Sequence, residues 1–289
     1  MILRLAYRPP LDWEAMLEFL GGRCTAGVEQ VEGGAYRRTV RIGKRVGWVS
    51  VTAEPSRPAL RVEVSSSLSA ARRPLEGRLR ALFDLDLDPG AVAAALGRDR
   101  LLAPSVRRNP GLRVNGAFDA FEAAVRVVLG QQVSVRAATT VAGRLAGALG
   151  EQVETPFAGL DRLAPTPGAV TSAGEDRIAR VGMPGARART LLALAGVIAS
   201  GDLVLERGTD PDLVRDRMLA LPGVGPWTAS LVAMRALGAP DAFPGGDLGV
   251  LRALGVKSAR EAEARAEAWR PWRAYAAMHL WNLAAGAGG

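Results

Sequence analysis

The hydrophobic pattern of this chain changes near residue 110, and that change constrains its fold more than any other feature. Before it, apolar and polar residues alternate in short β-type runs, and Gly33-Gly34 and Gly43-Lys44 stand where tight turns would join the strands into an antiparallel meander. Asp12 is placed to cap a helix that ends near Phe19. Strands are expected at residues 2–7, 25–31, 35–41, 46–52 and 60–64, and an amphipathic helix at 73–83. The first third is therefore expected to be mixed α/β.

The stretch 104–116 is rich in turn signals and marks a boundary. Beyond it, apolar residues recur at the spacing of a helix, and no β-type run of comparable quality interrupts them. Helices are expected at residues 118–130, 134–149, 175–180, 186–199, 211–219, 226–237, 248–254, 259–269 and 272–284. We therefore predict an α+β protein, with a mixed α/β domain at residues 1–112 and an all-α region of two helical lobes at residues 113–289.

The composition excludes several classes of metal or redox protein. A single cysteine, Cys24, excludes an intramolecular disulfide, a four-cysteine iron–sulfur cluster and a cysteine-built zinc site. The one histidine, His279, excludes a multi-histidine metal centre, and its place in a helix rich in tryptophan and leucine favours a structural role. No organic cofactor is expected. The chain lacks a long apolar run and a signal-like N-terminus, which predicts a cytoplasmic protein.

The net charge favours a polyanionic partner. Lys+Arg total 37 against 29 Asp+Glu, giving a formal charge of +8, and nucleic acid is the usual partner of such a field. Only Lys44 and Lys257 are lysines, so a genome that favours arginine is an alternative explanation of the composition.

The segment 221–229 (LPGVGPWTA) is the most informative motif, because Gly223 and Gly225 stand between two helical patterns. Glycines permit unusual backbone angles and leave no Cβ to obstruct a ligand that approaches the main chain. The N–H groups around Val224, and those of the helix start that contains Thr228, would then bind a phosphate without reading sequence. A simple corner between helices is the alternative, and the basic charge favours a helix-hairpin-helix that grips DNA.

Asp247 follows a Pro/Gly-rich loop at residues 243–246 and directly precedes a helix. From the residues alone, helix capping is the first interpretation of this aspartate. A carboxylate can also stabilise positive charge where water is excluded, and it can orient or deprotonate a water molecule. Both roles are compatible, since capping fixes the position of the carboxylate.

The hairpin followed by this aspartate resembles the helix-hairpin-helix DNA glycosylases. Further segments, in order and over nearly the whole chain, are similar to 3-methyladenine DNA glycosylase II of the AlkA type. They are residues 7–13 (YRPPLDW), 82–85 (LFDL), 120–122 (AFE), 129–134 (LGQQVS) and 269–276 (WRPWRAYA). The resemblance implies a monomeric, nucleoid-associated base excision repair enzyme with Asp247 as its catalytic group. Such an enzyme flips an alkylated base out of double-stranded DNA and hydrolyses the N-glycosidic bond.

The resemblance also bears on cleavage of the DNA backbone. Bifunctional relatives form a Schiff base with a lysine two residues after the second hairpin glycine, where this chain has Trp227. Lys44 and Lys257 do not match that position, so the chain is expected to be monofunctional and to leave an abasic site. A non-catalytic DNA-binding module and a bifunctional glycosylase/lyase remain the alternatives. Family members also hold an alkali ion on hairpin carbonyls, which here are those of Leu219, Leu221 and Val224.

Two tryptophans match the base pocket of the family, and a phenylalanine is expected to complete it. Trp227 and Trp281 occupy pocket positions, and Phe19 is expected to close the site from the first domain. Aromatic faces attract a cationic alkylated purine such as 3-methyladenine or 7-methylguanine. Each ring is also compatible with an ordinary place in the core.

Other positions depart from the family pattern. Better-known relatives carry tyrosines where this chain has Leu231, Leu248 and Asn282. The departure predicts a less aromatic, wider pocket that would also admit N1-methyladenine, N3-methylcytosine or ethenoadenine. Gln132 stands where a leucine commonly fills the gap left by the flipped base, and a glutamine there can hydrogen-bond the orphaned base. An exposed loop residue without that role is the alternative.

Overall fold

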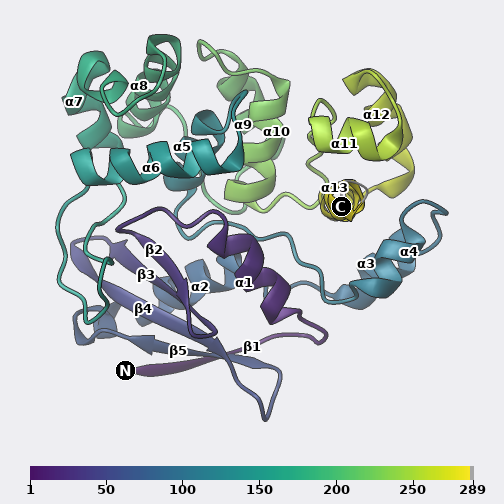
Figure 1. Cartoon of the computed structure of the whole chain (residues 1–289), viewed down its shortest axis with the longest axis horizontal. Helices are drawn as coiled ribbons and strands as arrows, with labels where there is room; N and C mark the ends of the chain where they lie inside the picture. The colour runs from purple at the N-terminus through teal and green to yellow at the C-terminus, as the bar shows by residue number, and fades with distance from the viewer. Residues whose placement is uncertain (287–289) are drawn as a thin grey trace.

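The structure, a computed structural model, describes residues 1–286 and has the predicted α+β fold. A five-stranded antiparallel sheet in the order β1-β5-β4-β3-β2 occupies the N-terminal part, and helices follow it (Figure 1). The strands are β1 (Ile2–Ala6), β2 (Glu29–Glu32), β3 (Ala35–Ile42), β4 (Arg45–Ala53) and β5 (Ala59–Val64). Residues 287–289, the end of the predicted all-α region, lie outside the described residues.

The predicted meander forms because the β-type runs alternate between buried and more exposed residues, and the two predicted glycine turns join β2 to β3 and β3 to β4. One expected strand is shorter than predicted. Of the run at 25–31, the part before β2 is a turn, because Gly27 has a φ of 83° and the Val28 N–H donates to the Thr25 carbonyl at 2.9 Å. The extended conformation therefore starts only after this turn.

Helices α1 (Trp13–Gly21) and α2 (Arg72–Leu82) pack with the sheet into one hydrophobic cluster. Asp12 caps α1 as expected, and its carboxylate accepts the Ala15 N–H at 3.0 Å. A turn of 3-10 helix, Ser66–Ala71, leads from β5 into α2. The cluster fixes α1 beside the sheet, so the C-terminal end of α1 can contribute to a site between the sheet and the helices.

Two helices that the sequence analysis missed, α3 (Pro89–Leu96) and α4 (Ala103–Arg108), contribute apolar residues to a cluster with the C-terminal helices rather than with the sheet. Asp88 caps α3 and Pro89 occupies its first turn, which is a recognised start signal. Helix α4 occupies part of the stretch that was expected to contain only turns. The hydrophobic clusters therefore do not divide at residue 112, and a domain boundary there stays a prediction.

The helical region forms two groups with separate hydrophobic clusters: α5 to α10, and α11 to α13 together with α3 and α4. Its helices are α5 (Ala120–Leu129), α6 (Val135–Leu149), α7 (Pro167–Ala179), α8 (Gly185–Ala199), α9 (Pro211–Leu219), α10 (Pro226–Val232), α11 (Leu248–Leu254), α12 (Ala259–Ala266) and α13 (Arg273–Gly286). Helix α10 continues into one π-helical turn, and a 3-10 turn follows α12. None of the described helices is long and apolar enough to cross a lipid bilayer.

Helix α7 starts earlier than predicted. The apolar spacing predicts a helix only from residue 175, whereas Thr166 caps α7 through its hydroxyl, which accepts the Ala169 N–H at 3.1 Å. Gly174 has a φ of 70° and kinks the helix, so the periodic pattern is broken at that point. The start signal was a Thr-Pro pair, which resembles the Asp-Pro pair of α3.

The segment between α6 and α7 returns to the sheet, where it runs beside the strands (Figure 1). The Thr39 hydroxyl on β3 donates to the Arg162 carbonyl at 2.6 Å. The rings of Trp48 on β4 and Phe157 meet edge to face with centroids 5.0 Å apart. These contacts attach the first group of helices to the sheet, so that both can line one cavity.

His279 has the structural surroundings that its sequence context favours. It is buried in α13, its Nδ1 lies 3.0 Å from the Ser105 hydroxyl on α4, and burial lowers its pKa to about 4. In the unfolded chain the pKa of histidine is near 6.5. Between these values the unfolded state binds more protons than the folded state, so acidification through this window lowers stability.

We expect the wild-type protein to lose about 2 kcal/mol more stability than a His279→Asn variant between pH 7 and pH 5. Asparagine can still hydrogen-bond Ser105 but does not titrate. Burial raises the pKa of Asp84 to about 6, which makes stability change in the opposite direction over this range. That contribution is common to both proteins and cancels in the comparison. Urea unfolding at the two pH values measures the difference, and equal pH dependence of the two proteins would contradict the prediction.

Candidate active site

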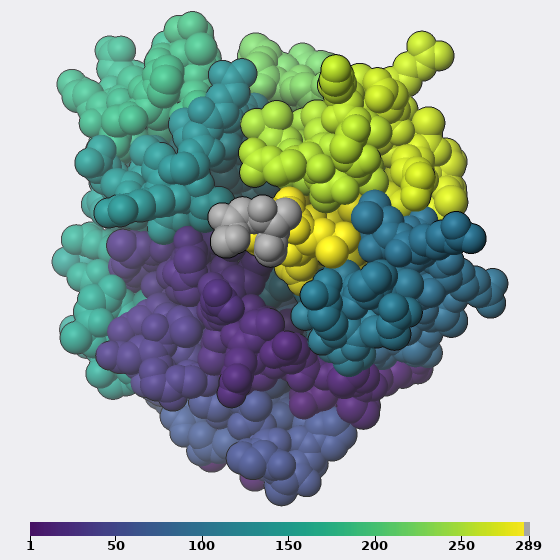
Figure 2. Space-filling model, turned by 45° about the vertical axis from the view of Figure 1, so that its right-hand side comes forward, coloured from purple at the N-terminus to yellow at the C-terminus, as the bar shows by residue number. Residues whose placement is uncertain are grey.

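A cavity of about 540 Å³ lies between α1, the two groups of helices and the loop that leads into α11. Figure 2 shows a recess between the first group of helices and the C-terminal group. The volume of the cavity is in the range of sites that bind small molecules. The aromatic and charged residues that matter most in its lining are Phe19, Arg23, Arg126, Trp227, Arg235, Asp247 and Trp281.

Asp247 lies in the wall of this cavity and is also the N-cap of α11. Its Oδ1 accepts the Trp281 indole N–H at 2.8 Å and the N–H groups of Gly249 at 2.9 Å and Val250 at 3.2 Å. Its Oδ2 accepts the Trp227 indole N–H at 3.0 Å. Four donors from three segments therefore fix both oxygens of one half-buried carboxylate, with the cavity beside it.

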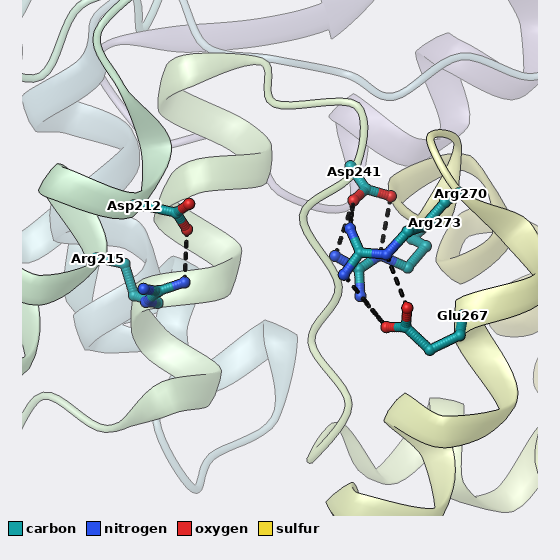
Figure 3. Close-up of polar contacts among 6 residues, drawn as sticks. All are labelled: Asp212, Arg215, Asp241, Glu267, Arg270 and Arg273. Carbon is teal, nitrogen blue, oxygen red and sulfur yellow. Dashed lines mark hydrogen bonds and ion pairs between the residues drawn. The ribbon is translucent and has the colours of Figure 1, made fainter.

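A cluster of ion pairs holds the loop that leads to this carboxylate (Figure 3). Asp241 in the loop accepts two hydrogen bonds from the Arg273 guanidinium at the start of α13, both at 2.8 Å. Arg270 also pairs with Asp241, and Glu267 pairs with both arginines. A bidentate pair of this kind fixes geometry as well as charge. The cluster thus ties the loop to the helix that supplies one of the tryptophan donors.

Four of the six predicted pocket residues line the cavity: Phe19, Trp227, Leu231 and Trp281. The other two do not, which corrects their predicted placement. Leu248 is 78% exposed in the first turn of α11. Asn282 lines an adjoining hollow, which shares Phe19 and Trp281 with the cavity.

Four arginines in the cavity lining were not predicted from the sequence: Arg23, Arg38, Arg126 and Arg235. Arg235 donates to the Asn115 carbonyl at 2.7 Å, and burial lowers its pKa to about 9, with the nearby charge of Arg23 adding to the effect. Burial also lowers the pKa of Arg23 and Arg126. An arginine within the otherwise apolar pattern of residues 231–237 was the available signal.

The hairpin between α9 and α10 has the tight geometry that its glycines predict. Gly223 has a φ of 74°, and a Cβ there would lie 2.2 Å from the Thr190 hydroxyl, so the turn requires glycine. A Cβ on Gly225 would meet nothing within 4 Å, which leaves its outer side open. The side chains of Val224 and Thr228 are buried, so only their backbone could face DNA.

The loop between α5 and α6 presents Gln132 to solvent in a left-handed backbone conformation, with a φ of 56°. Its neighbour Gln131 donates to the Gly223 carbonyl at 2.9 Å and to the Thr228 hydroxyl at 3.0 Å. Arg187 on α8 donates to the Gln131 carbonyl at 2.6 Å. The loop is therefore attached directly to the hairpin, and Gln132 stands at its exposed tip.

No metal site is formed by side chains within residues 1–286, where no group of three or more His, Cys, Asp or Glu residues is arranged to hold an ion. At the hairpin, the Leu221 carbonyl already accepts the Val224 N–H at 3.2 Å, and an alkali ion there stays a prediction. Lys44, in the turn between β3 and β4, and Lys257, after α11, are exposed and do not line the cavity.

Comparison with known proteins gives matches over both parts of the chain. Residues 2–119 match the model of the AlkA N-terminal domain, and residues 125–274 match that of the HhH-GPD superfamily base excision DNA repair protein. A probable bifunctional transcriptional activator/DNA repair enzyme AlkA of Mycobacterium tuberculosis is 42% identical over 97% of this chain and 56% of that protein. The chain thus spans about half the length of this relative.

Two further proteins are similar over almost their whole length. DNA-3-methyladenine glycosylase 2 of Escherichia coli is 33% identical, over 96% of this chain and 95% of that protein. The solved structure of a 3-methyladenine DNA glycosylase from Archaeoglobus fulgidus superposes with a TM-score of 0.83 at 24% identity, over 96% of this chain and 97% of that chain. The second likeness shows that the two chains share a fold.

Proposed function

Since the chain belongs to the HhH-GPD superfamily of base excision DNA repair proteins, as its motifs predicted, we propose that it is a DNA glycosylase acting on alkylated bases in double-stranded DNA. The observation that carries the proposal is the carboxylate of Asp247, held by the indole N–H groups of Trp227 and Trp281 in a cavity wall. A base turned out of the duplex would enter this cavity and place its sugar beside the carboxylate.

The proposed reaction is hydrolysis of the bond between C1′ and the base nitrogen. As this bond breaks, its electron pair leaves with the base, and positive charge develops on C1′ and the ring oxygen of the sugar. The negative charge of Asp247 stabilises this state, most strongly where the DNA excludes water. A water molecule then adds to C1′ and loses a proton, for which Asp247 is the positioned acceptor. The products are a free base and an abasic sugar.

The proposed DNA grip consists of the hairpin and the loop beside it. The open outer side of Gly225 lets a phosphate approach the main chain, and the start of α10 adds its favourable dipole. Gln132, at the exposed tip of the neighbouring loop, would fill the space that the flipped nucleotide leaves. The formal charge of +8 favours the encounter with DNA, and we propose that a single copy of the chain acts on it.

We infer that the product is an intact abasic site. Trp227 occupies the hairpin position of the Schiff-base lysine, and its N–H is used to hold Asp247. Both lysines lie outside the cavity lining, so neither supplies an amine for attack on C1′.

The proposed substrates are 3-methyladenine and 7-methylguanine, with N1-methyladenine, N3-methylcytosine and ethenoadenine as further candidates. Leu231 in the cavity lining supports the wider range, because it presents a smaller side chain than the tyrosine of better-known relatives. Leu248 and Asn282 do not line this cavity and give the wider range no support.

A panel of duplexes, each with one defined lesion, tests the proposed function. Heating in alkali after incubation converts abasic sites to strand breaks, and we expect breaks only at lesions that the protein releases. Borohydride should trap no covalent adduct, because no lysine reaches the sugar. Binding without release of any base would favour a DNA-binding module, and a trapped adduct would favour a glycosylase/lyase.

A further inference from the structure

The charges in the cavity are unevenly distributed. Within residues 1–286, none of Arg23, Arg126 and Arg235 forms an ion pair with a carboxylate, although all three line the cavity. Of the carboxylates in the lining, Glu29 and Glu122 pair with Arg38 on β3, Asp119 pairs with Arg78, and Asp247 accepts the tryptophan N–H groups. In the described part of the chain, Arg23 and Arg235 therefore stand beside the aromatic walls without a carboxylate in ion-pair contact.

Arg235 lies beside two aromatic walls of the proposed base site. Its guanidinium carbon is 5.0 Å from the centroid of the Phe19 ring and 5.5 Å from that of Trp281, whose N–H holds Asp247. Arg23 covers the same Phe19 ring at 3.8 Å. Both arginines thus use the negative faces of rings that would otherwise attract a cationic base.

Arg235 has donors to spare for a ligand. Its two terminal nitrogens donate to the Asn115 carbonyl and to the Met278 sulfur. No acceptor within the described part of the chain is assigned to its Nε–H or to the remaining terminal N–H groups. A base with acceptor atoms can therefore receive hydrogen bonds from this guanidinium.

The charge of the departing base depends on the lesion. A cationic base such as 7-methylguanine leaves as a neutral molecule, because it takes the electron pair of the broken bond. A neutral base such as 1,N6-ethenoadenine leaves with a negative charge, until it takes a proton from water. A fixed guanidinium stabilises the departing anion and raises the free energy of a bound cation.

We propose that Arg235, assisted by Arg23, shifts the preference of this site, among the lesions proposed above, toward neutral ones that carry hydrogen-bond acceptors and away from cationic ones. The proposal rests on the proposed glycosylase function and assigns its charge preference to two residues outside the family motifs quoted above. Arg235 stabilises the electron pair that leaves with a neutral base, whereas Asp247 stabilises the sugar. The two groups act on opposite sides of the bond that breaks.

Single-turnover release of ethenoadenine and of 7-methylguanine, from otherwise identical duplexes, tests the proposal. For Arg235→Met we expect release of ethenoadenine to fall about 10-fold or more, with release of 7-methylguanine unchanged or faster. Arg235→Lys keeps the charge and should stay near the wild-type ratio of the two rates. Arg23→Gln should shift the ratio in the same direction as Arg235→Met, by a smaller factor.

Arg61→Gln is the matched control, because Arg61 pairs with Glu63 on β5 and does not line the cavity. It should leave both rates unchanged. Binding of a duplex with an abasic-site analogue reports folded protein without a base in the cavity, and should be retained in every variant. If Arg235→Met does not bind this duplex, the variant is not folded, and the release rates of Arg23→Gln and Arg235→Lys test the proposal instead.

The proposal would be overturned if the ratio of ethenoadenine release to 7-methylguanine release stayed at the wild-type value in Arg23→Gln and in a folded Arg235→Met variant. An Arg235→Lys variant that loses ethenoadenine release as far as the methionine variant does would assign the effect to shape rather than charge. Failure of the wild-type protein to release either base would instead overturn the proposed function.

Discussion

Asp247→Asn is expected to lower single-turnover base release by about 10²- to 10³-fold or more, while binding of the duplex is retained. Asparagine has nearly the same shape and is a good N-cap, so α11 should keep its start. It lacks the negative charge that stabilises the sugar as the base departs. Excision rates and duplex affinity, measured on the same preparation, separate the two effects.

Asp88→Asn is the matched control for this variant. Asp88 caps α3 through one oxygen that accepts the N–H groups of Gly90 and Ala91, the same pattern that Asp247 makes with α11. It lies outside the cavity lining, so its replacement should leave base release unchanged. If Asp247→Asn releases bases at the wild-type rate, the carboxylate has only a structural role.

Trp281→Ala is expected to have the second largest effect, a loss of about 100-fold or more in base release. The variant loses an aromatic wall of the cavity together with the N–H that donates to Asp247 at 2.8 Å. A hydrogen bond to a charged group contributes about 1.5–3 kcal/mol, which corresponds to a rate factor of about 10 to 100. Trp281→Phe keeps a ring and loses only the donor, so its loss should be about 10-fold and fall mainly on kcat.

Trp272→Phe is the control for these substitutions, because Trp272 lies at the start of the same helix region, stacks edge to face with Tyr275 and does not line the cavity. It should release bases at the wild-type rate. Rates of base release from duplexes with the same lesion should be measured for the wild-type protein and the three variants. Equal activity of Trp281→Phe and wild type would show that the indole N–H does not contribute, and wild-type activity of Trp281→Ala would remove the ring from the site as well.

Features that depend on short stretches of sequence could be predicted. The cap at Asp12 and the turn at Gly223 need only the local backbone, and both are present in the structure. The predicted cap at Asp247 forms for the same reason. The resemblance of the chain to the glycosylase family predicted that this aspartate lies with Trp227 and Trp281. In the structure, both tryptophans donate a hydrogen bond to Asp247.

Features that depend on packing between distant segments could not be predicted from local patterns. Arg235 was not predicted as a site residue, because it is directed into the cavity by the π-helical turn and by contacts with the distant residues Asn115 and Met278. Leu248 follows Asp247 directly, but the start of α11 directs its side chain to solvent. Whether Arg235 and Leu248 face the cavity depends on the direction in which each side chain points around its helix. Spacing along the chain does not specify which distant segment packs against that side of the helix.

The hydrogen bonds from Gln131 to the hairpin have a consequence for how the protein would examine DNA. They connect the tip residue Gln132 to the proposed phosphate-binding hairpin through the side chain of Gln131. Gln132 and the hairpin would therefore contact the duplex at a fixed distance from each other. Each position along intact DNA would then be probed for a weakly stacked nucleotide at a fixed number of steps from the gripped phosphate.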